Sequence, residues 1–219
     1  MPIQVTTQPA ISAPAHPKLK ISRLRPLLRL GAFLQGVELV QDNTEPYHIK
    51  KLDSFPYSRY RFEEIGGPKR TFVLLSNFTG SQYNLLLNGY SIMTLCFDIS
   101  CSGANRGRRV DLYAVPIRKP IQSLNLKESY EQGGQGDIIH MTSLEPMANA
   151  DGSLSLSFTH GRIQPSIENT IICGANGERV MELYRTSQEY FEVLRHRSVP
   201  KEWVMALGLA AFDFKRGTE

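Results

Sequence analysis

The 219-residue sequence contains little cysteine, a single tryptophan and no apolar run long enough to cross a bilayer. Its three cysteines, Cys96, Cys101 and Cys173, are odd in number and include no C-x-x-C pair. They predict neither a disulfide framework nor a zinc site, so a reducing compartment is expected. A membrane-spanning helix needs about 20 consecutive apolar residues, so no such helix is expected. The sequence also lacks the apolar run near its start that is typical of a signal peptide.

Motifs for catalysis or metal binding are also missing. His48, His140, His160 and His196 are widely separated, and none forms an H-x-x-x-H pair of metal ligands. The glycine-rich stretch 133–136 lacks the lysine and the strand-to-helix context of a phosphate-binding loop, and no G-x-S-x-G motif of a hydrolase occurs. We therefore expect no enzyme activity, no metal and no cofactor.

Acidic residues are absent from the first 37 positions, which contain five basic side chains (Lys18, Lys20, Arg23, Arg25 and Arg29). The remaining residues carry 20 basic and 21 acidic side chains, so the body of the protein is nearly neutral. Nucleic-acid-binding domains usually carry a basic face, and no nucleic-acid partner is expected here. The sequence predicts a flexible, basic, proline-containing arm over residues 1–37 and one domain over residues 38–219.

Within the arm, residues 1–17 contain four prolines among serine, threonine and alanine, which is typical of a disordered tail. Residues 18–30 alternate basic and apolar side chains. This pattern suits an anionic membrane surface, an organelle transit peptide, or an ordinary edge strand or short helix with solvated charges. The sequence leaves these three interpretations open.

Residues 201–214 form the most apolar segment, with no polar side chain from Trp203 to Phe212. Its alanines and leucines favour a helix, and Pro200 is a typical residue for a helix start. A helix that is apolar on all sides must be enclosed, and this one rises only roughly 21 Å, so it is predicted to be a core helix wrapped by protein. The alternative is a hydrophobic pair of β-strands.

From Glu38 onward the sequence has strand character, with about eleven or twelve short strands separated by turn residues. Asn88-Gly89, Asp151-Gly152 and Asn176-Gly177 are strong hairpin signals, whereas residues 116–137 form the longest irregular stretch. A closed sheet of about twelve strands has a bore too wide for side chains alone, and a helix about 10 Å across would fill it. We therefore predict a mainly β fold, a closed antiparallel barrel of about twelve strands around a central hydrophobic C-terminal helix.

Two segments resemble the tubby family. Residues 158–163 read F-T-H-G-R-I and residues 166–169 read S-I-E-N, similar to the family signature F-x-G-R-V followed by S-V-K-N-F-Q. Residues 206–215 read A-L-G-L-A-A-F-D-F-K, similar to the closing motif A-F-A-I-x-L-S-S-F-D-S-K. Looser similarity covers residues 67–74 and 107–110. The resemblance implies a twelve-stranded barrel around a central helix, the same architecture that the packing argument predicts.

The resemblance also implies a function. Tubby domains bind phosphoinositides, tether to the plasma membrane and help to carry membrane cargo into cilia. On this basis the chain is expected to be a monomeric, cytoplasmic module, peripheral at the plasma or ciliary membrane, with a phosphoinositide-containing membrane and a protein cargo or trafficking complex as partners. Glu168 stands where the family has a lysine. The family also has a pair of basic residues just before an S-N-x-L-G stretch, and the similar stretch at residues 76–80 has no such pair before it. The alternative is therefore a protein-interaction adaptor that kept the barrel and lost the lipid site.

A phosphoinositide site needs lysines and arginines that converge on phosphate groups. The candidates are Lys69 and Arg70, and the dense group Arg106, Arg108 and Arg109, where neighbouring glycines would let the backbone approach a headgroup. For both groups the competing interpretation is a solvated hairpin. Convergence of the two groups on one concave face would favour lipid binding over the adaptor function.

Overall fold

The structure is a computed structural model that describes residues 4–7, 18–23, 37–41, 44–53, 57–64, 70–98, 109–123, 125–133, 136–159, 163–166, 168–186, 190–196 and 198–213. The described chain is mainly β, and nearly all of its strand pairs are antiparallel, which confirms the predicted fold class at that level.

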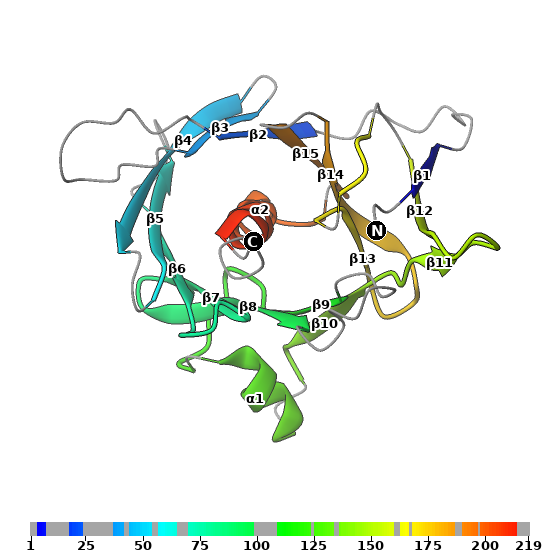
Figure 1. Ribbon diagram of the computed structural model, residues 1–219. Coiled ribbons are helices and arrows are strands. Elements are labelled where there is room, and N and C mark those ends of the chain that lie inside the picture. Colours follow the sequence, from blue (N-terminus) through cyan, green and yellow to red (C-terminus); the bar gives the residue numbers. More distant parts are fainter. Residues whose placement is uncertain are drawn as a thin grey trace.

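Twelve of the described strands pair side by side in a closed ring (Figure 1). Each strand is antiparallel to its neighbour, and the pairing of β9 with β10 completes the circuit. The ring strands are β2 (Lys18–Arg23), β3 (Val37–Gln41), β4 (Thr44–Asp53), β5 (Arg59–Glu64), β6 (Thr71–Ser76), β7 (Gln82–Leu87), β8 (Tyr90–Asp98), β9 (Arg109–Ala114), β10 (Ile139–Ser143), β13 (Thr170–Cys173), β14 (Arg179–Arg185) and β15 (Tyr190–Arg195).

The burial of the side chains fits strands that cover a core. Along β6, every second side chain is buried, as expected for a strand with one face on a core. The turn between β7 and β8 places Asn88 and Gly89 at positive φ (51° and 86°), the conformation that an Asn-Gly hairpin requires. Closure of the ring leaves these strands without the unpaired edges that promote aggregation.

Helix α2 (Lys201–Asp213) lies inside the ring in Figure 1. Side chains on all sides of it are buried: Val204, Met205, Leu207 and Ala210 have no exposed surface. They form one hydrophobic core with inward-facing residues of the ring strands. An all-apolar helix is stable in water only when it is enclosed in this way.

The N-terminal segment differs from the predicted flexible arm. A strand was one of the three interpretations of residues 18–30, and Lys18–Arg23 is a strand of the ring, paired with β15 on one side and β3 on the other. Strand β1 (Gln4–Thr7) pairs in parallel with β12 (Leu154–Phe158). Strand pairing therefore does not follow the predicted division at residue 37, because segments of the predicted arm are paired with segments far along the sequence.

A small second sheet, in the order β1-β12-β11, stands beside the ring near β13 and β14 (Figure 1). Strand β11 (Met147–Ala148) pairs with β12. Leu156 and Phe158 of β12 pack against Ile171, Tyr184 and Leu194 of the ring. Phe158 and Tyr184 meet edge to face, with ring centroids 5.7 Å apart. This outer cluster forms a second core on the outside of the ring.

The stretch 116–137, predicted to be irregular, contains the short helix α1 (Leu126–Glu131). The Asn125 side chain caps it by accepting a hydrogen bond from the Lys127 amide. Helix α1 contacts β8 and β9, and Figure 1 shows it on the outside of the ring. Six residues give too little periodicity to separate such a helix from a loop by sequence pattern.

The ring has two rims, which are named here by one residue at each. At the Asp213 rim, α2, β4 and β8 end, and β5 and β9 begin. Following the antiparallel register around the ring places the start of β14 and the end of β15 at the opposite rim, the Arg179 rim. Helix α2 begins near the Arg179 rim and ends at the Asp213 rim.

Candidate functional site

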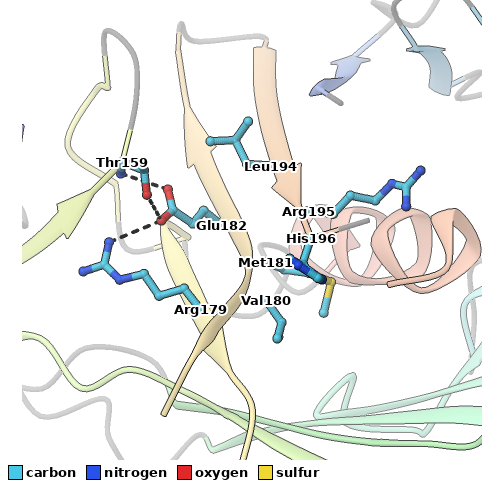
Figure 2. Close-up of a pocket in the computed structure, with 8 residues that line it drawn as sticks. All are labelled: Thr159, Arg179, Val180, Met181, Glu182, Leu194, Arg195 and His196. Atoms are coloured by element: carbon cyan, nitrogen blue, oxygen red, sulfur yellow. Dashed lines mark hydrogen bonds and ion pairs between the residues drawn. The ribbon is translucent and has the colours of Figure 1, made fainter. Parts of the chain in front are cut away.

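A pocket of about 180 Å³ lies at the Arg179 rim, next to the end of β12 (Figure 2). Its walls come from the start of β14, the end of β15 and the residue that follows β12. The lining residues are Thr159, Arg179, Val180, Met181, Glu182, Leu194, Arg195 and His196.

The carboxylate in this pocket is already fully engaged. Glu182 is only 4% exposed, and it accepts hydrogen bonds from the Thr159 amide, at 3.0 Å, and from the Thr159 hydroxyl. Its other contact is the Arg179 guanidinium, at 3.3 Å. These three donors satisfy the buried carboxylate. It attaches the end of β12 to the ring, and it does not contact His196 as a catalytic base pair would require.

The two guanidinium groups of the pocket do not converge. In Figure 2, Arg179 and Arg195 extend to opposite sides of β14. Arg195 donates a hydrogen bond to the Val199 carbonyl, at 2.6 Å, and so holds the turn that leads into α2. The His196 ring bonds to Ser198 in the same turn. A phosphate clamp needs cations aimed at one point, and this arrangement fixes two chain segments to the rim instead.

A second polar cluster lies at the opposite rim, where Asp213 ends α2. Its Oδ1 accepts hydrogen bonds from Lys51 Nζ, at 3.0 Å, and from the Tyr60 hydroxyl, at 2.6 Å. Its Oδ2 accepts one from the Tyr83 hydroxyl, at 3.1 Å. Lys51 also donates to Tyr60 and lies 4.9 Å from the centre of its ring. The Lys51 and Asp213 side chains are 4% and 6% exposed, so this is a buried ion pair.

Burial by itself raises the pKa of Asp213, but hydrogen bonds from Ser58 and Tyr60 and the charge of Lys51 outweigh it and lower the pKa overall. The carboxylate is therefore charged at neutral pH. Because its partners belong to β4, β5 and β7, the cluster attaches the end of α2 to three ring strands. It serves to position the helix, and its two charged side chains are almost wholly buried.

The structure separates the described members of the predicted phosphate site. Arg70 precedes β6 at the Arg179 rim, whereas Arg109 begins β9 at the Asp213 rim. Arg109 forms an ion pair with Asp111, at 3.3 Å, and that carboxylate raises the pKa of the guanidinium. Arg70 and Arg109 therefore do not act on one headgroup. Lys69, Arg106 and Arg108 lie outside the described residues.

Sequence reasoning missed Lys51 and Glu182. One signal for Lys51 was available: it directly follows Lys50 in a strand, and neighbouring strand residues face opposite sides, so one of the two lysines must point into the ring. Glu182 carries no comparable signal, because its partner Thr159 lies 23 residues away and on another sheet. Only the packing of β12 against β14 shows that pair.

The two described cysteines are poor nucleophiles. Burial raises the pKa of Cys96 to about 11 and also raises that of Cys173, so both thiols are protonated at neutral pH. Within the described ranges, no group of three or more His, Cys, Asp and Glu side chains is arranged to hold a metal ion. No helix in the same ranges is both long and apolar enough to cross a membrane. Comparison with known proteins found neither a matching family model nor a matching curated protein.

Proposed function

We propose that the chain is a non-enzymatic, tubby-like module that binds phosphoinositide headgroups at the plasma or ciliary membrane. The observation that carries the proposal is the anchoring of Asp213. This residue belongs to the Phe-Asp-x-Lys motif on which the resemblance rests, and it joins α2 to three strands of a closed ring. The motif therefore has a physical role in an architecture with a helix inside a ring of strands.

The packed interior directs the search for a ligand to the outer surface. Side chains of α2 form one hydrophobic core with the described ring strands, which leaves the outer surface as the better place for a ligand. The Asp213 rim is the better candidate of the two rims. Arg109 lies there, and Arg106 and Arg108 precede it directly in the sequence, with no acidic residue between positions 99 and 108. A role in ciliary cargo transport follows from the family resemblance alone.

The second candidate function is a protein-interaction adaptor with a tubby-like barrel. The separation of Arg70 and Arg109 on opposite rims favours it, because a single headgroup cannot bridge them. The adaptor would keep the same fold, and its partner would be a protein rather than a lipid.

Vesicle sedimentation separates the two functions. The full chain is mixed with phosphatidylcholine vesicles, with or without phosphatidylinositol 4,5-bisphosphate, at about 150 mM salt, where charges about 10 Å apart are largely screened. We expect binding that depends on the phosphoinositide and is lost when Arg106, Arg108 and Arg109 are changed to alanine. The matched control changes Arg118, Lys119 and Lys127, three exposed or half-exposed basic residues around α1, to alanine, which removes the same charge.

Equal loss in both triple variants would show that only net charge matters. Full binding by the Arg106/Arg108/Arg109 variant would place the headgroup elsewhere. No binding by the intact chain would exclude the lipid function and favour the adaptor. Deletion of residues 1–37 is unsuitable for this assay, because it removes ring strand β2.

A further inference from the structure

Two neighbouring chain segments at the Asp213 rim form a rigid tip, defined here as residues 57–59 and 77–81. They are joined by two hydrogen bonds: the Ser76 amide donates to the Ser58 carbonyl, at 2.9 Å, and the Ser58 amide donates to the Ser76 hydroxyl, at 2.7 Å. Because Arg59 is paired with Leu75, this register brings Tyr57 beside the turn that begins at residue 77. The aromatic side chains of the tip therefore stand on adjacent strands.

The turn at residues 77–81 is held by its own hydrogen bonds. Asn77 accepts from the Gln82 amide, at 3.1 Å, and its side chain donates to Ser81, at 3.0 Å. The Gly80 amide bonds to the Asn77 carbonyl, and Gly80 has a φ of 68°, which a glycine adopts without strain. Phe78 is therefore fixed in place by an ordered turn.

This ordered turn presents Phe78 to solvent. The Phe78 side chain is 67% exposed, the highest value among the large apolar side chains of the described residues, and the adjacent Tyr57 is 52% exposed. Burial of a phenylalanine side chain stabilises a fold, so a turn that keeps one exposed forgoes that stabilisation. Phe78 and Tyr57 are exposed on adjoining chain segments, and neighbouring exposed apolar side chains mark a contact surface.

The charge of the tip indicates which surface it contacts. Residues 57–59 and 77–81 include one basic residue, Arg59, and no acidic residue, and Asp53 at the end of β4 lies opposite Arg59. Asp213, which accepts a hydrogen bond from Tyr60 next to the tip, is paired with Lys51. Phenylalanine enters the acyl region of a bilayer, tyrosine prefers its interface and arginine pairs with lipid phosphates.

We infer that this tip inserts into the membrane, with Phe78 among the acyl chains, Tyr57 at the interface and Arg59 at the headgroups. The inference rests on the proposed function, and it adds an orientation: the Asp213 rim faces the bilayer and the Arg179 rim faces away. It also adds a salt-resistant contribution to binding, because insertion of apolar side chains is not screened by ions.

Tryptophan quenching by brominated lipids tests the inference on the full chain. Phe78→Trp is compared with Tyr90→Trp, a matched control that is 44% exposed in a hairpin at the opposite rim. The native Trp203 is 4% exposed inside the ring and serves as an internal reference beyond the reach of lipid. The vesicles contain phosphatidylcholine and phosphatidylinositol 4,5-bisphosphate, with bromines on the acyl chains. We expect quenching in Phe78→Trp only.

Sedimentation of Phe78→Ser with the same vesicles provides the second readout. Loss of one inserted phenylalanine should weaken binding about tenfold, whereas Tyr90→Ser should bind like the unmodified chain. If vesicles bind the protein and neither reporter is quenched, the insertion is wrong and the membrane function stands. Quenching of Tyr90→Trp alone would reverse the orientation and overturn the inference. If no vesicle binds the unmodified chain, both the function and the insertion fail.

Discussion

At the scale of single residues, Asp213 shows how a buried charge is stabilised when its partners offset the free energy lost on leaving water. Two unit charges removed from water are stable only when they are close and their remaining hydrogen-bonding groups are satisfied. Lys51 and the hydroxyls of Tyr60 and Tyr83 meet that condition for Asp213. The cluster lies at the one point where an otherwise apolar helix must end, so it fixes the position of that end.

The Asp213→Ala variant should be strongly destabilised, because it leaves Lys51 charged, buried and without its partner. Removal of one member of a buried pair costs about 3–5 kcal/mol. Urea unfolding measures the change. Asp137→Ala is the matched control: Asp137 pairs with Lys119 at the surface, where ion pairs contribute about 0–1 kcal/mol. Similar free energies of unfolding for the two variants would contradict the buried-pair account.

The pH dependence of stability gives a second readout of the same residue. The pKa of Asp213 is lower in the folded chain than in the unfolded chain, so its ion pair contributes stability above the unfolded pKa. That contribution is lost as the pH falls from about 4, the usual aspartate pKa, through the lower folded pKa. The unmodified chain should therefore lose stability over this range more steeply than Asp213→Asn. Parallel pH profiles would show that Asp213 is not charged in the folded state.

At the scale of the elements, α2 tests the claim that a helix can be enclosed on every side. Leu207 and Leu209 are two residues apart, which places them about 200° apart around a helix. Both are at most 1% exposed. A helix packed on one face of a sheet would bury only one of such a pair.

Leu207→Ala and Leu209→Ala should therefore each destabilise the protein by about 2–5 kcal/mol, the usual cost of a cavity in a packed core. Thermal unfolding of each variant measures the loss. Leu52→Ala, at a side chain 38% exposed on β4, provides the control and should change stability much less. A large effect at only one of the two helix positions would mean that α2 lies against a single wall.

Local patterns were sufficient to predict most of these elements. The Asn88-Gly89 turn and the apolar run after Pro200 each predict the element that the structure contains. The strand at Gln4–Thr7 was not predicted, because it depends on β12, a partner more than 100 residues away. For Lys18–Arg23 an edge strand was one of three interpretations, and only its pairing with both β3 and β15 shows that it belongs to the ring. The pocket at Glu182 and the rims that separate Arg70 from Arg109 depend on register around the ring, which no local pattern contains.

At the scale of the whole molecule, closure of the ring joins distant parts of the chain. Strand β2 is bonded to β15, so the circuit depends on a segment that composition alone assigns to a flexible arm. Without β2, strands β3 and β15 would each have an unpaired edge. Exposed strand edges are sites of aggregation.

Truncation should therefore have two distinct outcomes. Removal of residues 1–17 deletes β1 and leaves the ring complete, so that variant should remain folded and soluble. Removal of residues 1–36 deletes β2 as well and should give lower thermal stability and concentration-dependent association. Size-exclusion chromatography and thermal unfolding distinguish these outcomes. A stable, non-associating product after the longer deletion would show that the ring does not need β2.

The order of the elements along the chain has a consequence for biosynthesis. Every ring strand leaves the ribosome before the helix around which the strands close. Until α2 emerges, the inner faces of those strands have no apolar partner, and early strands cannot complete the circuit with β15. We therefore expect the nascent chain to depend on chaperones for most of its translation and to reach its native state only after the final helix is released.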